Sequence, residues 1–462
     1  MANNEGGHAR VARPIRTNLE IKNASAIRRN VSMSNCAIVG INWGDEGKGR
    51  MVDYFADHYQ VVVRYQGGNN AGHTVKNPRG KFVLNLLPSG ILRPEVVCVM
   101  GNGMLIDPHH LDGEIASLRE KGIEISPANL KISDRATICM PFHVEQDGLE
   151  EERLSKTGAQ FGSTKRGIAY GYADKYMKKT LRMGDLLHLD ENVKRRLATI
   201  VESKNLVMEG CYNAKPTDLE EMWAWCQKYA EIFKDYICDA GDYLDKADRE
   251  GKKILFEAQL GALRDIDFGI YPYTSSSNVI GAYAPIGAGI PGHKLDLSIG
   301  IMKAYSSCVG DGPFTAELAM TEEEKDKLRE AGHEYGAATG RPRRVGPIDV
   351  VASRYGVGCQ GCDEVALTLL DVLDYMEKIP VVAHYQLADG TLTDRFPMGK
   401  ALDEAKPVVE YLPGWHCDIT ACRKFEELPA EAQNYVNYLE KQIGCRIAYI
   451  SVGAERDACI RR

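Results

Sequence analysis

Short apolar runs alternate with amphipathic segments along most of the chain. The apolar runs are bounded by turn residues and predict buried strands, whereas the patterns at 109–121 and 219–249 predict helices. Such alternation is typical of a large, mainly parallel sheet that is flanked by helices and binds ligands at the carboxyl ends of its strands. The sequence therefore predicts an α/β fold. The strands are expected at 36–39, 61–65, 96–100, 253–257, 365–370, 381–385 and 446–452.

The segment 219–249 carries an aromatic and apolar stripe at near-helical spacing. Such a stripe more often faces the core than a cofactor, so we interpret it as core. Its members are Trp223, Trp225, Tyr229, Phe233 and Ile237.

The first part of the chain differs from the rest in composition. Residues 1–32 contain several arginines and little apolar periodicity, which predicts a disordered N-terminal extension or an upstream choice of start codon. An organelle transit peptide is the alternative interpretation. Neither an internal repeat nor a linker interrupts the pattern that follows. We therefore expect 33–462 to form a single catalytic body.

Composition narrows the class of protein. The chain has 462 residues, of which 44% are hydrophobic and 26% charged, and it has no apolar run long enough to cross a bilayer. The net charge of −7 argues against nucleic-acid binding. A small phosphorylated ligand, met by local clusters of Lys and Arg, fits this composition better.

The 13 cysteines, with no signal peptide, favour a reducing and cytoplasmic compartment. Two groups of residues make a tetrahedral zinc site conceivable. Their spacing does not settle the matter, and scattered free thiols are the favoured interpretation. The possible zinc ligands are Cys359, Cys362, His416, Cys417 and Cys422.

The glycine-rich segment 40–50 follows the first apolar run and precedes a helical pattern. Its four glycines let the backbone approach a polyphosphate, and Lys48 can neutralise the phosphate charge, which predicts a P-loop-like phosphate-binding loop. Gly49 stands where an ordinary P-loop has a Ser or Thr that binds magnesium. Asp45 would repel phosphate unless it serves a cation or a proton transfer. This carboxylate therefore indicates chemistry.

Five further segments contain candidate ligand-binding residues. His73 follows Gly72 in a second glycine-rich loop and can donate to a developing oxyanion or a transferring phosphoryl group, although a structural histidine is the alternative. The segment 336–344 places three arginines among small residues, which favours carboxylate or phosphate binding over a solvated charge run. Weaker signals are Thr164, Ser275 and Asp371, of which the last two more often cap helices.

Several of these motifs occur together, in order, in one known family. The chain from about residue 33 to its end resembles the adenylosuccinate synthetases, through GDEGKG, YQGGNNAGHT, LPSGIL, GIYPYTSSSN, KAYSSCVGDGPF, EYGAATGRPRR and LDVLD. The resemblance implies a GTP-dependent ligase that joins IMP and L-aspartate with Mg²⁺ as cofactor. It also implies a homodimer.

The resemblance further implies a role for each catalytic residue. Asp45 takes the proton from N1 of IMP, so that O6 attacks the γ-phosphate of GTP and forms 6-phosphoryl-IMP. His73 acts as general acid in this step. The amino group of aspartate then displaces phosphate and gives adenylosuccinate. The implied metal ligands are Asp45 and the Gly72 carbonyl.

The binding residues follow from the same resemblance. GTP is expected to contact Gly44, Asp45, Glu46, Gly47, Lys48, Gly49, Arg50, Gly72, His73, Thr74, Arg343, Leu369, Leu370, Asp371, Ser451, Val452 and Gly453. IMP is expected to contact Asp45, Lys48, Asn70, Ala71, Gly72, His73, Thr164, Lys178, Leu260, Ser275 and Arg341. Aspartate is expected to contact Ala337, Ala338, Thr339, Gly340, Arg341, Pro342 and Arg343.

The chain departs from the family pattern at four places. Leu369 replaces a lysine that packs on guanine, and Leu260 falls at the place of an IMP-binding glutamine, with Gln259 one residue earlier. Lys178 replaces an arginine that reaches the partner's IMP, and Ala169-Tyr170 replaces Gly-Pro. The alternatives are therefore the same ligase chemistry on another purine nucleotide or with ATP, and a catalytically silent nucleotide-binding homologue.

Overall fold

A ten-stranded sheet forms the centre of the computed structural model, which describes residues 35–77, 80–159, 162–335, 340 and 342–462. The strand order is β20-β19-β15-β11-β1-β10-β2-β5-β7-β9. All neighbours in this sheet pair in parallel except β19 and β20. The bounds are β1 (Asn35–Gly40), β2 (Val61–Arg64), β5 (Val97–Met100), β7 (Leu130–Ser133), β9 (Ile237–Cys238), β10 (Ile254–Glu257), β11 (Leu297–Lys303), β15 (Glu364–Thr368), β19 (Arg446–Ser451) and β20 (Cys459–Arg461).

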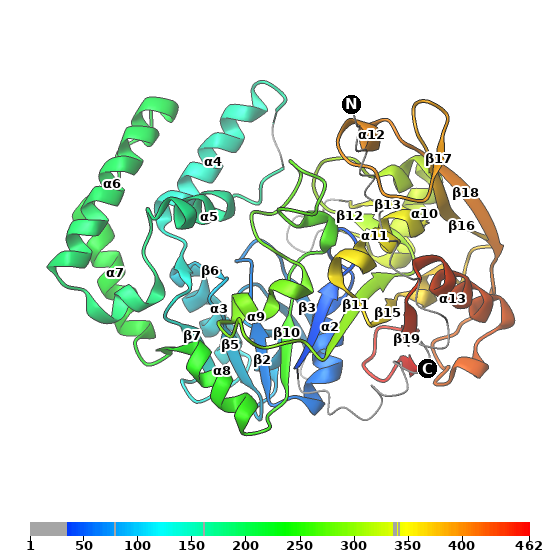
Figure 1. The fold of residues 1–462 in the computed structure, drawn as a ribbon, viewed down its shortest axis with the longest axis horizontal. Helices are drawn as coiled ribbons and strands as arrows, with labels where there is room; N and C mark the ends of the chain where they lie inside the picture. Colours follow the sequence, from blue (N-terminus) through cyan, green and yellow to red (C-terminus); the bar gives the residue numbers. More distant parts are fainter. Residues whose placement is uncertain (1–34, 78–79, 160–161, 336–339, 341) are drawn as a thin grey trace, which may run out of the picture. The chain divides into compact units, whose positions relative to one another are not determined.

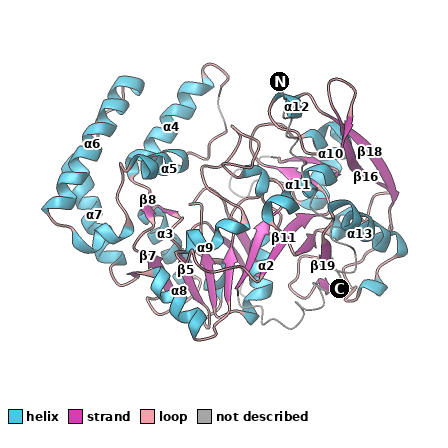
Figure 2. Cartoon of the chain, in the orientation of Figure 1, coloured by secondary structure: helices cyan, strands magenta, loops and turns pink. Residues whose placement is uncertain are grey.

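Helices cover both faces of this sheet, as Figures 1 and 2 show. Successive strand residues point to opposite faces, so Ile38 packs with α2 and α3, and Ala37 packs with α8 and α9. The predicted α/β class is confirmed. The helices are α2 (Lys48–Phe55), α3 (Pro108–Glu120), α4 (Pro141–Ser155), α5 (Ile168–Met177), α6 (Glu191–Tyr212), α7 (Leu219–Phe233), α8 (Ala240–Arg249), α9 (Ala284–Ala288), α10 (Glu322–Gly332), α11 (Val350–Gln360), α12 (Lys400–Asp403) and α13 (Ala430–Ile443).

Smaller sheets surround the central one. One joins β14, β16, β17 and β18, and the others are the pairs β3–β4, β6–β8 and β12–β13. The strand expected at 381–385 lies within β16, so it belongs to a smaller sheet. The bounds are β3 (His73–Asn77), β4 (Gly80–Leu84), β6 (Leu105–Ile106), β8 (Thr137–Ile138), β12 (Ser306–Cys308), β13 (Arg344–Gly346), β14 (Ile348–Asp349), β16 (Lys378–Gln386), β17 (Leu392–Thr393) and β18 (Lys406–Pro413).

The expected single helix over 219–249 is wrong. The segment forms α7, then β9, then α8, because Ile237 pairs with β7 and the Asp239 carboxylate caps α8 by accepting from Asp242 N at 3.0 Å. The core interpretation of the stripe is confirmed, since Tyr229, Phe233 and Ile237 are buried and the two tryptophans pack against the same core.

The strand expected at 365–370 also ends early. β15 stops at Thr368, and Leu369 adopts a left-handed conformation with φ 59° before the 3₁₀ helix η8 (Leu370–Leu373). Asp371 is therefore placed in η8 and not at the end of a strand.

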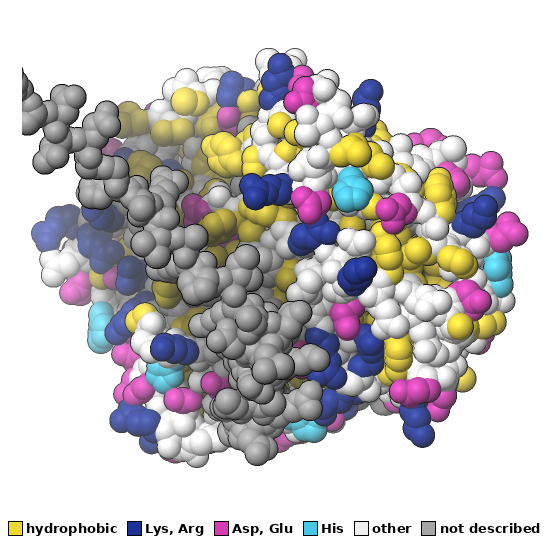
Figure 3. All heavy atoms as spheres, turned by 45° about the vertical axis from the view of Figure 1, so that its right-hand side comes forward, with side chains coloured by type: hydrophobic (Ala, Val, Ile, Leu, Met, Phe, Trp, Pro, Cys, Tyr) yellow, Lys and Arg dark blue, Asp and Glu magenta, His cyan; other side chains and the backbone are white. Residues whose placement is uncertain are grey.

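Residues Ser34–Arg462 form one compact unit. The expected extension 1–32 lies outside the described residues. Within the described ranges, no helix combines the length and apolarity needed to cross a membrane. Figure 3 shows Lys and Arg side chains interspersed with Asp and Glu over the visible face.

Candidate active site

The phosphate loop runs from the end of β1 at Gly40 to the start of α2 at Lys48. Gly44, Asp45 and Gly47 have φ angles of 102°, 58° and 94°. Glycine adopts this region freely, whereas an aspartate there is uncommon and is often found where function requires strain. The loop therefore presents the Asp45 side chain from a left-handed backbone.

Glu46 shapes the interior of this loop. Its Oε1 accepts from Asn42 N at 3.1 Å and Gly44 N at 2.8 Å, and its Oε2 lies 2.5 Å from Lys48 Nζ. Both charged side chains are 2% exposed. Thr368, at the end of β15, donates to the Glu46 carbonyl at 2.7 Å. Lys48, predicted to neutralise phosphate, is thus held at the loop by a buried carboxylate.

His73 lies directly against the phosphate loop. A Cβ built on Gly49 would be 2.8 Å from the His73 Cβ, so only glycine allows this approach. His73 Nδ1 donates to Glu257 Oε1, and its Nε2 is buried without a partner among the described residues. The unpartnered nitrogen is the polar atom that remains available for a ligand.

Glu257 is the partner that fixes the His73 ring. It is fully buried at the end of β10 and also accepts from Ser89 N at 2.7 Å and Ser89 Oγ at 2.6 Å. Burial raises the Glu257 pKa, but the His73 hydrogen bond and the nearby Arg64 charge outweigh it, so the pKa is lowered. Burial lowers the pKa of His73, and Glu257 opposes this shift only in part.

The second glycine-rich loop is held by Gln259. Its Nε2 donates to Gly68 O at 3.1 Å, Asn70 Oδ1 at 3.3 Å and Ala71 O at 3.4 Å. Leu260, the next residue, adopts a φ of 63°. A glutamine is therefore present beside the predicted IMP residues, although it lies one position before the place that the family pattern gives it.

Ser275 is brought to the same loop through other side chains. Ser275 Oγ lies 3.4 Å from Ser277 Oγ, which donates to Gln66 Oε1 at 2.9 Å. Gln66 Nε2 in turn donates to the Gln259 carbonyl at 2.8 Å. The structure thus joins the hydroxyl-rich segment to the loop that carries Asn70, Ala71 and Gly72.

Arg343 connects the arginine segment to the phosphate loop. Its Nη2 lies 3.0 Å from Asp45 Oδ2, and its Nη1 lies 2.8 Å from Glu334 Oε2. The Asp45 side chain is 33% exposed, whereas Glu334 is 1% exposed. Gly340 and Pro342 are exposed. The predicted residues Ala337, Ala338, Thr339 and Arg341 lie outside the described residues.

The predicted guanine-binding residues lie near each other around α2. Arg50 donates to Ser451 Oγ, to Glu455 O at 2.7 Å and to Ala458 O at 3.3 Å. Asp371 Oδ1 is buried without a partner in the described part of the chain, and burial raises the pKa of this carboxyl. Arg50 therefore connects the phosphate-loop helix to the segment with Ser451, Val452 and Gly453.

Thr164 and Lys178 are exposed residues beside α5. Two carboxylates hold the Thr164 loop: Asp147 accepts from Ser163 Oγ at 2.7 Å, and Glu151 accepts from Ser163 N at 3.1 Å. Lys178 ends α5 with a φ of 62°.

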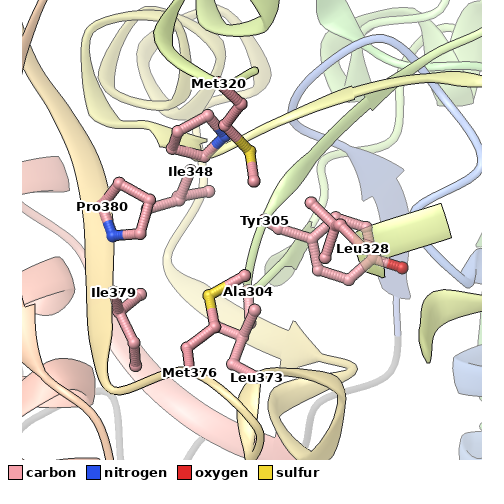
Figure 4. A pocket seen from close by; sticks show the side chains of 10 residues that line it. Ala304, Tyr305, Met320, Leu328, Ile348, Leu373, Met376, Ile379 and Pro380 are labelled. Atoms are coloured by element: carbon pink, nitrogen blue, oxygen red, sulfur yellow. The ribbon is translucent and has the colours of Figure 1, made fainter. Parts of the chain in front are cut away.

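A small pocket elsewhere is lined by uncharged residues, so it does not suit phosphate (Figure 4). The pocket residues are Ala304, Tyr305, Met320, Leu328, Pro347, Ile348, Leu373, Met376, Ile379 and Pro380.

The 13 cysteines are free. No group of three or more His, Cys, Asp or Glu side chains suited to a metal ion occurs within the described ranges.

Comparison with known proteins decides the family. Residues 37–460 match the family model described as adenylosuccinate synthetase. The chain belongs to the adenylosuccinate synthetase family. An adenylosuccinate synthetase from Caldanaerobacter subterraneus subsp. tengcongensis is 44% identical over 429 residues, which cover 93% of this chain and 99% of the relative. The relative from Heliobacterium modesticaldum has the same identity and coverage.

Solved structures agree with this assignment. A fully ligated adenylosuccinate synthetase from Plasmodium falciparum has a TM-score of 0.86 and 34% identity, covering 93% of this chain and 100% of that chain. The succinoaminodeoxyadenylate synthetase of cyanophage S-2L has a TM-score of 0.56 at 18% identity, which shows the shared fold alone. This adenylosuccinate synthetase family member is a ligase that joins IMP and aspartate in purine biosynthesis.

Glu257 and Glu334 are the site residues that sequence reasoning missed. Glu257 ends the strand expected at 253–257, and Glu334 lies two residues before the arginine segment 336–344. A carboxylate at the carboxyl end of a buried parallel strand was the available signal for Glu257. Glu334 is the first residue of the motif EYGAATGRPRR, but the motif does not indicate its role, because its partners Lys303 and Arg343 are brought to it by the fold.

Proposed function

We propose that this ligase uses GTP to activate O6 of IMP as 6-phosphoryl-IMP before aspartate attacks. The observation that carries the proposal is the contact of Gly49 with His73, with Asp45 four residues before that glycine. A phosphate-binding turn, a proton acceptor and a proton donor then serve one reaction centre.

In the first step Asp45 takes the proton from N1 of IMP. The electrons of that bond make O6 nucleophilic, O6 bonds to the γ-phosphorus, and the bond from that phosphorus to the β–γ bridging oxygen breaks to release GDP. His73 Nε2 faces the charge that develops, because Nδ1 is already committed to Glu257. A proton at Nε2 therefore requires the imidazolium form, which the Glu257 carboxylate stabilises.

In the second step the amino group of aspartate attacks C6, and phosphate leaves with the O6 atom. The amino group loses a proton, and adenylosuccinate is formed. Aspartate binding by residues 337–343 remains our proposal, and the described members of this set are Gly340, Pro342 and Arg343.

Mg²⁺ fits the oxygen donors at this site. The half-buried Asp45 carboxylate and the carbonyl of the exposed residue Gly72 are hard ligands of the kind that Mg²⁺ accepts. When bound, the ion would neutralise phosphate charge.

The test is phosphate release by purified protein with IMP, aspartate, Mg²⁺ and either GTP or ATP, with adenylosuccinate followed by its absorbance. Product that depends on GTP supports the proposal. Product only with ATP contradicts the guanine assignment and points to Leu369. Absence of product with both nucleotides would favour another purine substrate or a catalytically silent nucleotide-binding protein.

We also propose a homodimer in which Lys178 reaches the partner's IMP. Tyr176 and Met177, which precede Lys178, are 71% and 57% exposed, which supports an apolar contact there. Sedimentation with and without IMP tests this proposal. A persistent monomer with full activity would contradict it.

A further inference from the structure

The Glu334 carboxylate is fixed from three sides. Its Oε1 accepts hydrogen bonds from Lys303 Nζ and from the Tyr305 hydroxyl, both at 2.6 Å. Its Oε2 accepts from Arg343 Nη1 at 2.8 Å. The Lys303 and Glu334 side chains are 4% and 1% exposed. A buried carboxylate with three donors has little freedom, so it fixes the guanidinium that it binds.

The donors to Glu334 belong to the central sheet and its neighbourhood. Lys303 is the last residue of β11, which pairs with β1, the strand that leads into the phosphate loop. Tyr305 follows it and lines the apolar pocket of Figure 4. The position of Glu334 is therefore tied to the same sheet as Asp45.

The backbone reinforces this arrangement. Arg343 N donates to the Glu334 carbonyl at 2.9 Å, and Arg329 Nε donates to the Arg343 carbonyl at 2.9 Å. Both the main chain and the side chain of Arg343 are thus bound to fixed groups.

The other side of the Arg343 guanidinium faces the reaction centre. Nη2 contacts the Asp45 carboxylate, and Nε is buried without a hydrogen-bond partner among the described residues. Arginine has more donors than these two carboxylates use. The unused donor suits an anion with several acceptor oxygens, such as the phosphates of a nucleoside triphosphate.

We propose that Glu334 is a positioning residue for the ligase reaction. Lys303 and Tyr305 hold Glu334, and Glu334 keeps Arg343 beside Asp45. When GTP binds, the Arg343 guanidinium leaves the Asp45 carboxylate and pairs with the γ-phosphate instead. The proton acceptor is thus engaged until the nucleotide arrives and is then released toward N1 of IMP. This inference rests on the proposed use of GTP.

The charges around Glu334 favour its ionised form. Burial raises the pKa of this carboxyl, but the positive charges of Lys303 and Arg343 outweigh burial, so the pKa is lowered. Glu334 therefore remains an acceptor for Arg343 when the other partner of the guanidinium changes from Asp45 to phosphate.

The first test variant is Glu334→Gln, which leaves the buried ammonium group of Lys303 without its carboxylate. A second variant avoids this unpaired charge. The double variant Lys303→Met/Glu334→Gln removes both charges of the buried pair. We expect both variants to lose roughly tenfold or more in kcat/KM for GTP, because Arg343 is displaced from the transferring phosphate. KM for IMP should stay within about twofold, because Glu334 acts through Arg343 alone.

The neighbouring arginine supplies a matched control. Arg344 pairs with Glu317, and these side chains are 30% and 24% exposed. Glu317→Gln removes the carboxylate partner of an arginine that, within the described part of the chain, is not paired with Asp45, so the kinetics of this variant should match those of the wild type. Thermal unfolding of each variant verifies that it is folded.

A double-mutant cycle separates positioning from a structural role. We expect Arg343→Ala/Glu334→Gln to lose no more activity than Arg343→Ala, because Glu334 acts through the missing guanidinium. If the activity loss of the double variant equals the product of the losses of the two single variants, the proposal is overturned. A folded Lys303→Met/Glu334→Gln variant with wild-type kinetics would also overturn it. If the wild type itself shows no GTP-dependent turnover, the proposed use of GTP fails and this inference fails with it. An active wild type with unaffected variants overturns the inference alone.

Discussion

Gly49 and His73 are in direct contact, and a Cβ on the glycine would be 2.8 Å from the Cβ of the histidine. This contact explains why the phosphate loop lacks the Ser or Thr of an ordinary P-loop. A hydroxyl-bearing side chain at residue 49 would occupy the space of the His73 side chain. The loop therefore packs against a histidine at the position where an ordinary P-loop carries a metal-binding hydroxyl.

Gly49→Ser should displace His73 and lower kcat by roughly 100-fold, because misplacement of a catalytic group by about 1 Å can have this effect. Steady-state kinetics measure the loss. Gly210→Ala in α6 is the control, since a Cβ there meets nothing within 4 Å. Wild-type kcat for Gly49→Ser would show that the contact has no catalytic consequence.

In a profile of kcat/KM against pH, we call the fall in activity that follows deprotonation of His73 the His73 limb. Glu257→Gln should move this limb to lower pH. Burial already lowers the pKa of His73, and loss of the negative partner removes the hydrogen bond and charge that raise it. General-acid activity is present below this pKa and is lost as pH rises through it. The measurement is kcat/KM between pH 5 and about 9, a range chosen to include the ordinary histidine value.

Glu114→Gln is the matched control for that experiment. Glu114 is another largely buried carboxylate, but it accepts from the backbone of Asn85 and Leu86 at 2.8 Å and 2.9 Å. Its substitution should reduce stability and leave the His73 limb in place. Equal shifts in both variants would exclude a specific effect of Glu257 on His73.

Asp45→Asn should abolish turnover, because the amide cannot take the N1 proton. GTP binding should persist in part, since the phosphate-loop backbone and Lys48 are unchanged. Calorimetric titration with a non-hydrolysable GTP analogue, beside the turnover assay, measures the two effects separately. Retained turnover would remove Asp45 from its catalytic role.

Asp349→Asn should flatten part of the dependence of stability on pH. Asp349 is fully buried, and burial raises the pKa of its carboxyl to about 6, above the ordinary aspartate value. The folded state therefore holds this proton more tightly than the unfolded state. Its stabilising contribution is complete below the unfolded pKa and is lost as pH rises through the folded pKa. The loss is at most about 3 kcal/mol between pH 4 and about 7.

Urea unfolding of wild type and Asp349→Asn at both ends of that range tests the sign. The amide oxygen can still accept from Ala352 N, so the α11 cap is preserved. The free energy of unfolding of the wild type should fall relative to the variant as pH rises. Asp389→Asn, in an exposed turn where the aspartate pKa is lowered, should not show this fall. Parallel curves for wild type and Asp349→Asn would contradict the expectation.

Local patterns predicted the sheet, the phosphate loop and the loop of His73, because each depends on residues close together in sequence. They could not predict the pair of His73 and Glu257, which are 184 positions apart in the sequence and are brought together only by the fold. The break after α7 was missed for a related reason. A two-residue strand pairing with β7 overrode a spacing that fits a continuous helix.

The candidate site draws on the carboxyl ends of six adjacent strands, β19, β15, β11, β1, β10 and β2. Its predicted residues run from Gly44 in the phosphate loop to Gly453, which follows β19. No early fragment of the chain can therefore hold the complete reaction centre. During synthesis the growing polypeptide must emerge almost entirely before it can turn over substrate, so catalytic competence is one of the last properties that this protein acquires.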